Sequence, residues 1–232
     1  MTLLREEDTS VNKFNIKTKE LFEIVPEYLK PYFDEAEYPW EILPKIKEIC
    51  GKILEKGLEG YTILEEGILV GRNVKIAKTA TINPPAIIGH DTEIRPGAYI
   101  RGNVIVGEQC VVGNSSEFKN CILLDRVQNP HYNYVGDSIL GFYSHMGAGS
   151  ITSNVKSDKT LVVVKCDGEE IETGLKKFGA MLGDHVEVGC NSVLNPGTVI
   201  GRNTNIYPLS PVRGVIPANS IYKDKEHIVN KK

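Results

Sequence analysis

The sequence predicts a mainly β protein: a left-handed parallel β-helix built from hexapeptide repeats, preceded by an α-helical N-terminal segment. The first observation is an apolar residue at every sixth position over ten consecutive stops: Val70, Ile76, Ile82, Ile88, Ile94, Ile100, Val106, Val112, Phe118 and Leu124. The second is a mostly small residue two positions before each stop, such as Ala80, Ala86 and Ala98. Residues i−2 and i share one face of a strand, so each hexad predicts a short strand with two inward side chains.

The bends between these strands are marked by Gly, Asn and Pro, for example at Pro84-Pro85, Pro96-Gly97 and Gly102-Asn103. Gly and Asn tolerate positive φ, and Pro fixes the entry to a turn. Short strands joined by tight corners at a constant period stack as a parallel β-helix. The same period returns in two later runs, Tyr134–Thr152 and Leu182–Ile206. An antiparallel β protein with coincidental spacing is the alternative, and three in-phase runs argue against it.

The period is interrupted twice. Leu124 and the next stop, Tyr134, are ten residues apart, which predicts a loop at 125–133 that bulges out of the solenoid. The longer gap between Thr152 and Leu182 predicts a second loop at 155–178. Within it, LVVVKC and EEIET flank Asp167-Gly168 and predict a β-hairpin with a type I′ turn. Surface loops on a rigid scaffold commonly carry function.

Three parts follow from these patterns: a helical N-terminal segment at 1–60, the β-helix at 61–222 and a C-terminal tail at 223–232. Ile42, Ile46, Ile49 and Ile53 are spaced as one stripe of a helix. Residues 1–15 are polar and predict loose order. We expect the helices to cap the open end of the solenoid, because its first coil would otherwise expose the core.

Composition excludes several classes of protein. The net charge of −3 does not favour a nucleic-acid partner. Five cysteines without a C-x-x-C pair favour reduced thiols in a cytosol, with Cys110 and Cys190 as small apolar fillers of the repeat. The acidic start has no apolar stretch typical of a signal peptide, and no run is long enough to span a membrane. We therefore expect a cytoplasmic protein without membrane or nucleic-acid partners.

The candidate catalytic residues lie around the interruptions. His131 and Tyr134 belong to N-P-H-Y-N-Y-V-G-D-S (129–138), and histidine is the side chain best suited to take a proton near neutral pH. Asn154 ends G-A-G-S-I-T-S-N (147–154), while Arg95 and Lys119 follow repeat stops at outward corners. A base, an amide and cations suit acyl transfer to an amine that carries a phosphate.

Each of these residues also has a structural explanation. Arg95 and Lys119 sit where solvated corner residues are common, Asn154 suits a turn, and a loop histidine such as His131 often bonds to the backbone. Both interpretations of each residue stay open until its geometry is known.

Several of these segments resemble a known family. G-N-S-S-E-F-K (113–119), H-Y-N-Y-V-G-D-S (131–138) and G-A-G-S-I-T-S-N (147–154) resemble the acetyltransferase domain of glucosamine-1-phosphate acetyltransferase / UDP-N-acetylglucosamine pyrophosphorylase. The hairpin insertion and G-L-K-K-F-G-A-M-L-G-D (174–184) resemble the archaeal-type version of that bifunctional enzyme. Y-P-W-E-I-L (38–43) resembles the segment that joins its two domains. The resemblance covers residues 38–215.

The resemblance implies a CoA-dependent N-acetyltransferase that acts on an amino sugar phosphate such as glucosamine-1-phosphate. Acetyl-CoA is the implied co-substrate, no metal is implied, and the implied assembly is a homotrimer. His131 resembles the base that deprotonates the sugar amine. Arg95 and Lys119 resemble the cations that hold the sugar phosphate, and Tyr134 and Asn154 resemble residues that orient the amino sugar and the thioester.

Four further residues carry implied binding roles. Lys159 resembles a lysine that reaches the site from a neighbouring subunit, although it lies one residue closer to Asn154 than in the bacterial pattern. Acetyl-CoA is expected in a groove between coils near 180–213, with Ala180 and Cys190 as contacts and Arg213 as a loose candidate for a CoA phosphate.

The sequence departs from the bacterial pattern at three points. His145 stands where the bacterial motif has an asparagine before M-G-A-G, which bears on which amino sugar the substrate site accepts. Compared with the bacterial pattern, six extra residues separate Arg95 from Lys119. One extra hexad shifts the position of one residue relative to the other by one side of a coil. No Gly-rich phosphate loop precedes a βα unit, so we expect no nucleotidyltransferase domain in this sequence.

Two alternative functions stay open on the same fold. A γ-carbonic-anhydrase-like metal enzyme needs about three protein ligands. The histidines are residues 90, 131, 145, 185 and 227, without an H-x4-H pair, and no third ligand is evident beside His131 and His145. A non-catalytic or regulatory member of the family is the other alternative. Metal analysis and CoA calorimetry separate these alternatives from the acetyltransferase.

Overall fold

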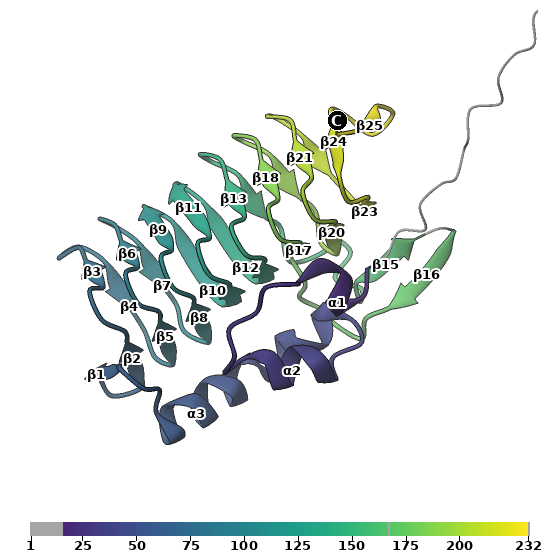
Figure 1. The fold of residues 1–232 in the computed structure, drawn as a ribbon. Helices are drawn as coiled ribbons and strands as arrows, with labels where there is room; N and C mark the ends of the chain where they lie inside the picture. Colours follow the sequence, from purple (N-terminus) through teal and green to yellow (C-terminus); the bar gives the residue numbers. More distant parts are fainter. Residues whose placement is uncertain (1–15, 167, 232) are drawn as a thin grey trace, which may run out of the picture.

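The computed structural model describes residues 16–166 and 168–231, and it confirms the mainly β fold, a parallel β-solenoid with a short helical segment before it (Figure 1). The predicted loose order of residues 1–15 lies outside the described residues. The helices are α1 (Thr18–Leu21), α2 (Lys30–Glu35), the 3-10 helix η1 (Pro39–Lys45) and α3 (Ile46–Lys56). None of the helices in the described ranges is long and apolar enough to cross a membrane.

Each coil of the solenoid contributes one strand to each of three faces. The first face holds β2 (Ile68–Val70), β5 (Ala86–Ile88), β8 (Val104–Val106), β17 (Ala180–Leu182), β20 (Thr198–Ile200) and β23 (Val215–Ile216). The second face holds β3 (Lys75–Ile76), β6 (Glu93–Ile94), β9 (Val111–Asn114), β11 (Gln128–His131), β13 (His145–Met146), β18 (Glu187–Val188), β21 (Asn205–Ile206) and β24 (Ser220–Tyr222). The third face holds β4 (Thr81–Ile82), β7 (Tyr99–Ile100), β14 (Ile151–Thr152), β19 (Val193–Leu194) and β22 (Pro211–Val212).

Two longer strands, β10 (Glu117–Leu123) and β12 (Tyr134–Leu140), run through the corner from the third face to the first. At each bend a single residue with positive φ turns the chain, Asn120 at φ 48° and Asp137 at φ 47°. These two corners are each one residue shorter than the others. Paired residues on neighbouring coils are therefore 17 positions apart there, as Val106 and Leu123 are, instead of 18, as Ile88 and Val106 are.

The shorter corners correct the sequence prediction at 125–133. This segment is not a bulging loop, because β11 forms there and pairs in parallel with β9 and β13. Because each of these bends is one residue shorter than the period of six requires, the inward residues are Leu123 and Val135 rather than the predicted Leu124 and Tyr134. Leu124 instead packs on the helix side of the solenoid.

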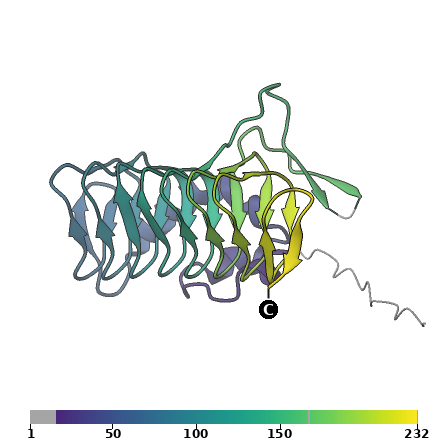
Figure 2. The same ribbon diagram turned by 90° about the horizontal axis from the view of Figure 1, so that it is seen from above.

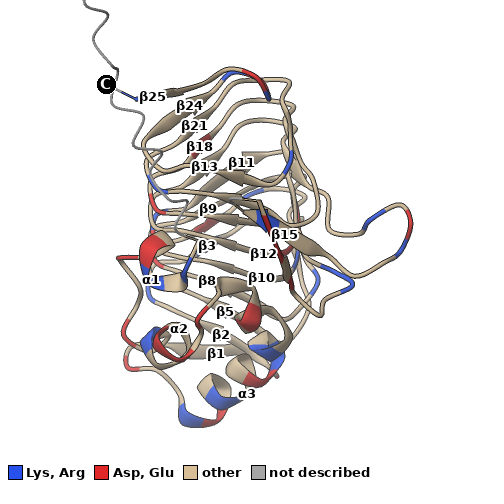
Figure 3. Cartoon of the chain, turned by 90° about the vertical axis from the view of Figure 1, so that its right-hand side faces the viewer, with Lys and Arg blue, Asp and Glu red and all other residues tan. Residues whose placement is uncertain are grey.

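The helices cover the first face along its length instead of capping the open end, which corrects that expectation (Figure 1). The reason is that the strands of this face carry an apolar residue at their outward central position as well as at the inward ones. This outward stripe packs against helix residues such as Trp40, Ile46 and Ile49, and consists of Leu69, Ile87, Ile105, Ile122, Ile139, Met181 and Val199. The helices carry both Lys and Asp or Glu residues (Figure 3), with ion pairs such as Lys52–Glu48 at 2.6 Å.

The second interruption is an insertion that stands away from the coils (Figure 2). It contains the predicted hairpin, β15 (Val163–Cys166) paired antiparallel with β16 (Glu169–Glu172). Asp167 of the predicted type I′ turn lies outside the described residues. Phe178 anchors the end of the insertion, because it is fully buried and its ring lies 5.7 Å from that of Trp40.

Short antiparallel strands close both ends of the solenoid. β1 (Thr62–Glu65) pairs with β2 at the first coil. β25 (Ile228–Asn230) pairs with β24 at the last coil. Part of the predicted C-terminal tail is therefore a strand that folds back onto the sheet.

Asn129 is an exception inside the solenoid core. It faces inward between Val112 and Met146, is fully buried, and neither atom of its side-chain amide has a hydrogen-bond partner among the described residues. A buried polar group without a partner costs about 1–3 kcal/mol. We expect Asn129→Val to raise the free energy of unfolding by about 1–2 kcal/mol, measured by chemical denaturation.

Asn133 provides the matched control for this prediction. It is also buried, but its Nδ2 donates to the Gly147 carbonyl at 2.9 Å and to Ser150. Asn133→Val should therefore lower the free energy of unfolding. Destabilisation by both substitutions would contradict the assignment of Asn129 as an unsatisfied group.

Candidate functional site

A hydrogen-bonded cluster lies at the edge between the third and first faces, and its centre is Asp137. Asn154 Nδ2 donates to Asp137 Oδ2 at 2.5 Å and to Tyr134 Oη at 3.3 Å. Lys119 Nζ forms an ion pair with Asp137 at 3.3 Å, and Asn120 Nδ2 donates to its Oδ1 at 3.0 Å. The side chain of Asp137 is only 6% exposed. The structure therefore unites the predicted residues Lys119, Tyr134 and Asn154 around a carboxylate that the sequence analysis did not single out.

The backbone of β12 explains why these side chains meet. Gly136 leaves room for the phenol ring of Tyr134, because a Cβ atom there would lie 2.5 Å from Tyr134 Oη. Asp137 has a positive φ and forms the corner that directly follows the third face. Burial, and then the charge of Asp137, raises the pKa of Tyr134 above its usual range. The phenol therefore keeps its proton at neutral pH.

The N-terminal segment reaches the same cluster. Asn120 Nδ2 donates to the backbone carbonyl of Leu43 in η1 at 3.2 Å as well as to Asp137. Phe178 N–H donates to the carbonyl of Asn154 at 3.0 Å, which ties the start of the insertion to its end. The site thus depends on the helices and the insertion as well as on the coils.

His131 and Cys190 lie at the other edge of the third face, where it meets the second. His131 ends β11 and is exposed, and within the described ranges its ring has no hydrogen-bond partner. Cys190 is also exposed at this edge, which corrects its prediction as a buried filler, whereas Cys110 is buried as expected. Burial raises the pKa of the Cys110 thiol well above its usual range, so it is no candidate nucleophile.

Arg95 is also at this second edge, paired with Glu93 at 3.4 Å, and so it does not join Lys119. The 24 residues between Arg95 and Lys119 equal one 18-residue coil plus one side of six. Arg101 instead lies directly beside Lys119, one coil earlier on the same edge, paired with Glu117 at 2.6 Å. The sequence analysis missed Arg101, although its spacing of 18 from Lys119 was the available signal.

The remaining predicted residues are dispersed. His145 faces outward on the second face, with Nδ1 2.8 Å from Glu187 Oε2. Lys159 is exposed in the insertion at φ 58°. Ala180 is fully buried in the solenoid core, so its side chain is not accessible to a cofactor, contrary to the prediction. Within 16–166 and 168–231, no group of three His, Cys, Asp or Glu side chains is arranged to hold a metal.

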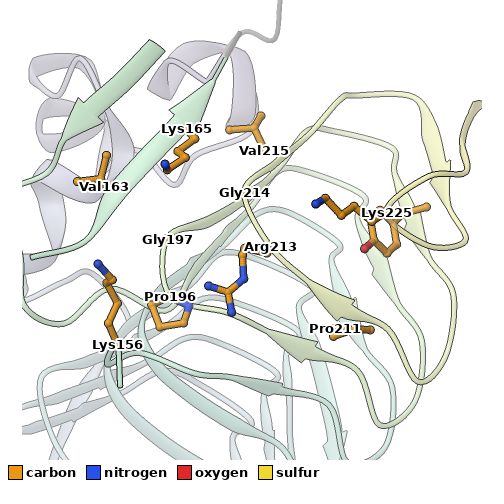
Figure 4. A pocket seen from close by; sticks show the side chains of 11 residues that line it. Lys156, Val163, Lys165, Pro196, Gly197, Pro211, Arg213, Gly214, Val215 and Lys225 are labelled. Atoms are coloured by element: carbon orange, nitrogen blue, oxygen red, sulfur yellow. The ribbon is translucent and has the colours of Figure 1, made fainter. Parts of the chain in front are cut away.

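Arg213 lies on the same edge as Lys119 and lines a cavity of about 600 Å³ between the insertion hairpin and the last coils (Figure 4). Lys156, Lys165 and Lys225 also line it, so four cationic side chains surround this space. A smaller cavity of about 250 Å³ shares Lys156 and Arg213 with it. The smaller cavity also includes residues 153 and 155, the chain neighbours of Asn154.

Comparison with protein families gives a match over residues 82–216 to the model described as the GMPPB C-terminal domain. The chain belongs to this family. It is also 33% identical over 214 residues to the bifunctional protein GlmU of Methanococcus vannielii, and 34% identical over 213 residues to that of Methanocaldococcus jannaschii. Each alignment covers 88% of this chain and 50% of the relative. The chain is therefore homologous to the C-terminal half of archaeal GlmU, and it spans about half the length of these relatives.

Other matches are more distant. A bifunctional sugar-1-phosphate nucleotidylyltransferase/acetyltransferase of Sulfurisphaera tokodaii is 28% identical over 196 residues, covering 83% of this chain and 49% of that protein. Among solved structures, PerB from Caulobacter crescentus in complex with CoA and GDP-perosamine has a TM-score of 0.40 at 16% identity, covering 64% of this chain and 52% of that one. The family assignment rests on the sequence matches. These place the chain with the GMPPB C-terminal domain and with the C-terminal half of archaeal GlmU.

Proposed function

We propose that this chain transfers an acetyl group from acetyl-CoA to the amine of an amino sugar phosphate, with glucosamine-1-phosphate as the first acceptor to test. The observation that carries the proposal is the hydrogen-bonded cluster on the exposed third face, in which Asn154 donates to both Asp137 and Tyr134. Homology to the C-terminal half of proteins named as bifunctional GlmU supports the same reaction class.

His131 is the proposed general base. Its imidazole is exposed and makes no hydrogen bond with the described residues, so it is free to take a proton from the substrate ammonium. The amine then attacks the thioester carbonyl, a C–N bond forms, and the C–S bond breaks. The nitrogen loses its second proton to the departing CoA thiolate, which leaves as the free thiol, so no covalent enzyme intermediate is needed.

Tyr134 is the proposed donor to the reacting oxygen or the sugar. Its Oη accepts from Asn154, which leaves its own O–H free to donate. The raised pKa of Tyr134 favours the protonated phenol that this role needs. A donor aimed at a developing oxyanion contributes about 3–4 kcal/mol to lowering the barrier.

We also propose that the complete site forms between copies of the chain. His131 and the Asp137 cluster occupy opposite edges of the third face. The corner at Tyr132, with φ 51°, and the third-face part of β12 separate them. A trimer in which the His131 edge of one copy meets the Asn154 edge of the next would unite them, with Lys159 in reach of the neighbouring copy.

The test is release of free CoA thiol from acetyl-CoA with glucosamine-1-phosphate, with the acetylated product identified by mass spectrometry. We expect product to form with wild-type protein and no product without the amine acceptor. If the protein neither binds CoA in calorimetry nor acetylates any amino sugar phosphate tested, the non-catalytic alternative replaces this proposal.

A further inference from the structure

We infer that the N-terminal helical segment positions the proposed active site, and that Asn120 is the positioning residue that connects the two. Asn120 Nδ2 donates to the backbone carbonyl of Leu43 in η1 at 3.2 Å and to Asp137 Oδ1 at 3.0 Å. The amide nitrogen carries two hydrogens, so each of them is used in one of these bonds. Because η1 precedes residues 82–216, the part of the chain that the family model matches, this connection reaches a segment outside the matched part.

The orientation of the Asp137 carboxylate depends on this connection, because its two oxygens have different partners. Oδ2 accepts from Asn154 at 2.5 Å, whereas Oδ1 accepts from Asn120. Lys119 Nζ lies near both oxygens, at 3.3 and 3.5 Å, and so does not by itself select one orientation. A turn of the carboxylate would break the bond from Asn120 and move Oδ2 away from Asn154. Asn120 therefore fixes the position of Asn154 and, through it, that of Tyr134.

A second connection runs from η1 to the cluster through the end of the insertion. Trp40 of η1 is buried, and its ring lies 5.7 Å from the ring of Phe178. Phe178 N–H donates to the carbonyl of Asn154 at 3.0 Å, and Gly179 N–H donates to the carbonyl of Asp137 at 2.8 Å. The 3-10 helix η1 thus reaches both partners of the Asp137–Asn154 hydrogen bond, by two separate routes.

A role in the turn alone does not account for Asn120. Its φ of 48° suits asparagine, but the register of β8 and β10 places Asn103 at the same corner one coil earlier, with φ 53°. The side chain of Asn103 makes no hydrogen bond with the residues that the structure describes. The corner therefore needs only a residue that tolerates positive φ, and the bonds to Leu43 and Asp137 are additional. Asn103 also provides a matched control.

The first test is Asn120→Gly, which removes the amide and leaves a residue suited to positive φ. The kinetic effect rests on the proposed function. We expect kcat for acetyl transfer from acetyl-CoA to glucosamine-1-phosphate to fall at least about tenfold, because Asn154 and Tyr134 are less well placed. The KM for acetyl-CoA should change less than about twofold, since the cluster acts on the chemical step. Asn103→Gly should leave both constants unchanged.

The role of η1 itself is tested by Trp40→Leu, which loosens η1 without replacing a residue of the cluster. The control is Phe22→Leu, which removes another buried ring of the N-terminal segment, one whose neighbour is the ring of Phe33 at 5.5 Å. Both variants are assayed well below their melting temperatures. We expect Trp40→Leu to lower kcat about threefold or more and Phe22→Leu to change it less than about twofold.

A double-mutant cycle tests the connection without turnover. Asn120→Gly and Asp137→Gly both place glycine at a positive φ, and the two are combined in the full chain. If Asn120 holds Asp137, Asn120→Gly should lower the midpoint of chemical denaturation less in the Asp137→Gly protein than in wild type.

Four results would overturn the inference. They are a wild-type kcat for Asn120→Gly, an equal loss of kcat for Asn103→Gly, equal losses for Trp40→Leu and Phe22→Leu, and equal shifts of the denaturation midpoint in the double-mutant cycle. Absence of acetyl transfer by wild-type protein would instead remove the proposed function. The denaturation cycle then decides by itself whether Asn120 holds Asp137.

Discussion

Replacing His131 by alanine is expected to lower kcat for acetyl transfer by about 10²- to 10⁴-fold, the usual range for loss of a general base. The side chain is exposed at the end of β11 and makes no hydrogen bond with the described residues, so the fold should persist. Steady-state kinetics with acetyl-CoA and glucosamine-1-phosphate measure the effect. The KM for acetyl-CoA should change little, because the imidazole acts on the amine.

Two comparisons separate a base from a merely structural histidine. His185→Ala removes another exposed imidazole, at the corner between the first and second faces, and should leave kcat unchanged. The rate of His131→Ala should also recover partly as pH rises, because more of the substrate amine is then already deprotonated. Equal turnover by His131→Ala and wild type would refute the base assignment.

Asp137→Asn is expected to reduce both activity and stability, because one carboxylate accepts from Asn154 and Asn120 and pairs with Lys119. The variant leaves Lys119 without its counter-charge and presents an amide where every partner is a donor. Breaking a buried pair costs about 3–5 kcal/mol, and we expect about 2–3 kcal/mol here because Lys119 is 24% exposed. We expect kcat/KM to fall at least about tenfold because Asn154 and Tyr134 lose their fixed positions.

The double variant Asp137→Asn with Lys119→Met distinguishes the two effects. Removing the unpaired ammonium should restore part of the free energy of unfolding, measured by chemical denaturation, but not the activity. Asn154→Ala added to Asp137→Asn should cost less than it does in wild type, because the two residues act as one unit. A wild-type melting temperature and kcat/KM for Asp137→Asn would contradict the central role of this carboxylate.

The solenoid was predictable because its inward residues repeat at a fixed period of six, and few folds other than a β-helix repeat at that period. The position of the helices was predicted wrongly, as a cap over the open end, because the outward apolar residues of the same strands, such as Ile87, Ile105 and Ile122, were not recognised. These outward apolar residues recur only once per coil, so they are hard to recognise among the inward residues, which recur at every sixth position.

The candidate site was predictable in residue type and less so in geometry. Lys119, Tyr134 and Asn154 do meet, but only through Asp137, a residue within a quoted motif to which no role was given. Arg95 was placed with Lys119 because the family resemblance implied it, although the six extra residues between them already indicated a shift by one side of the coil. Two bends made by single residues, Asn120 and Asp137, also moved the inward register by one residue each, which a count of sixes does not reveal.

The most direct test of a site formed between copies is to co-express the inactive variants His131→Ala and Asn154→Ala. If one copy supplies His131 and the next supplies Asn154, random mixing in a trimer leaves about a quarter of the sites with both residues intact. We therefore expect acetyl transfer near a quarter of the wild-type rate, although each variant alone is inactive. No activity above that of the separate variants in mixed assemblies would contradict the account.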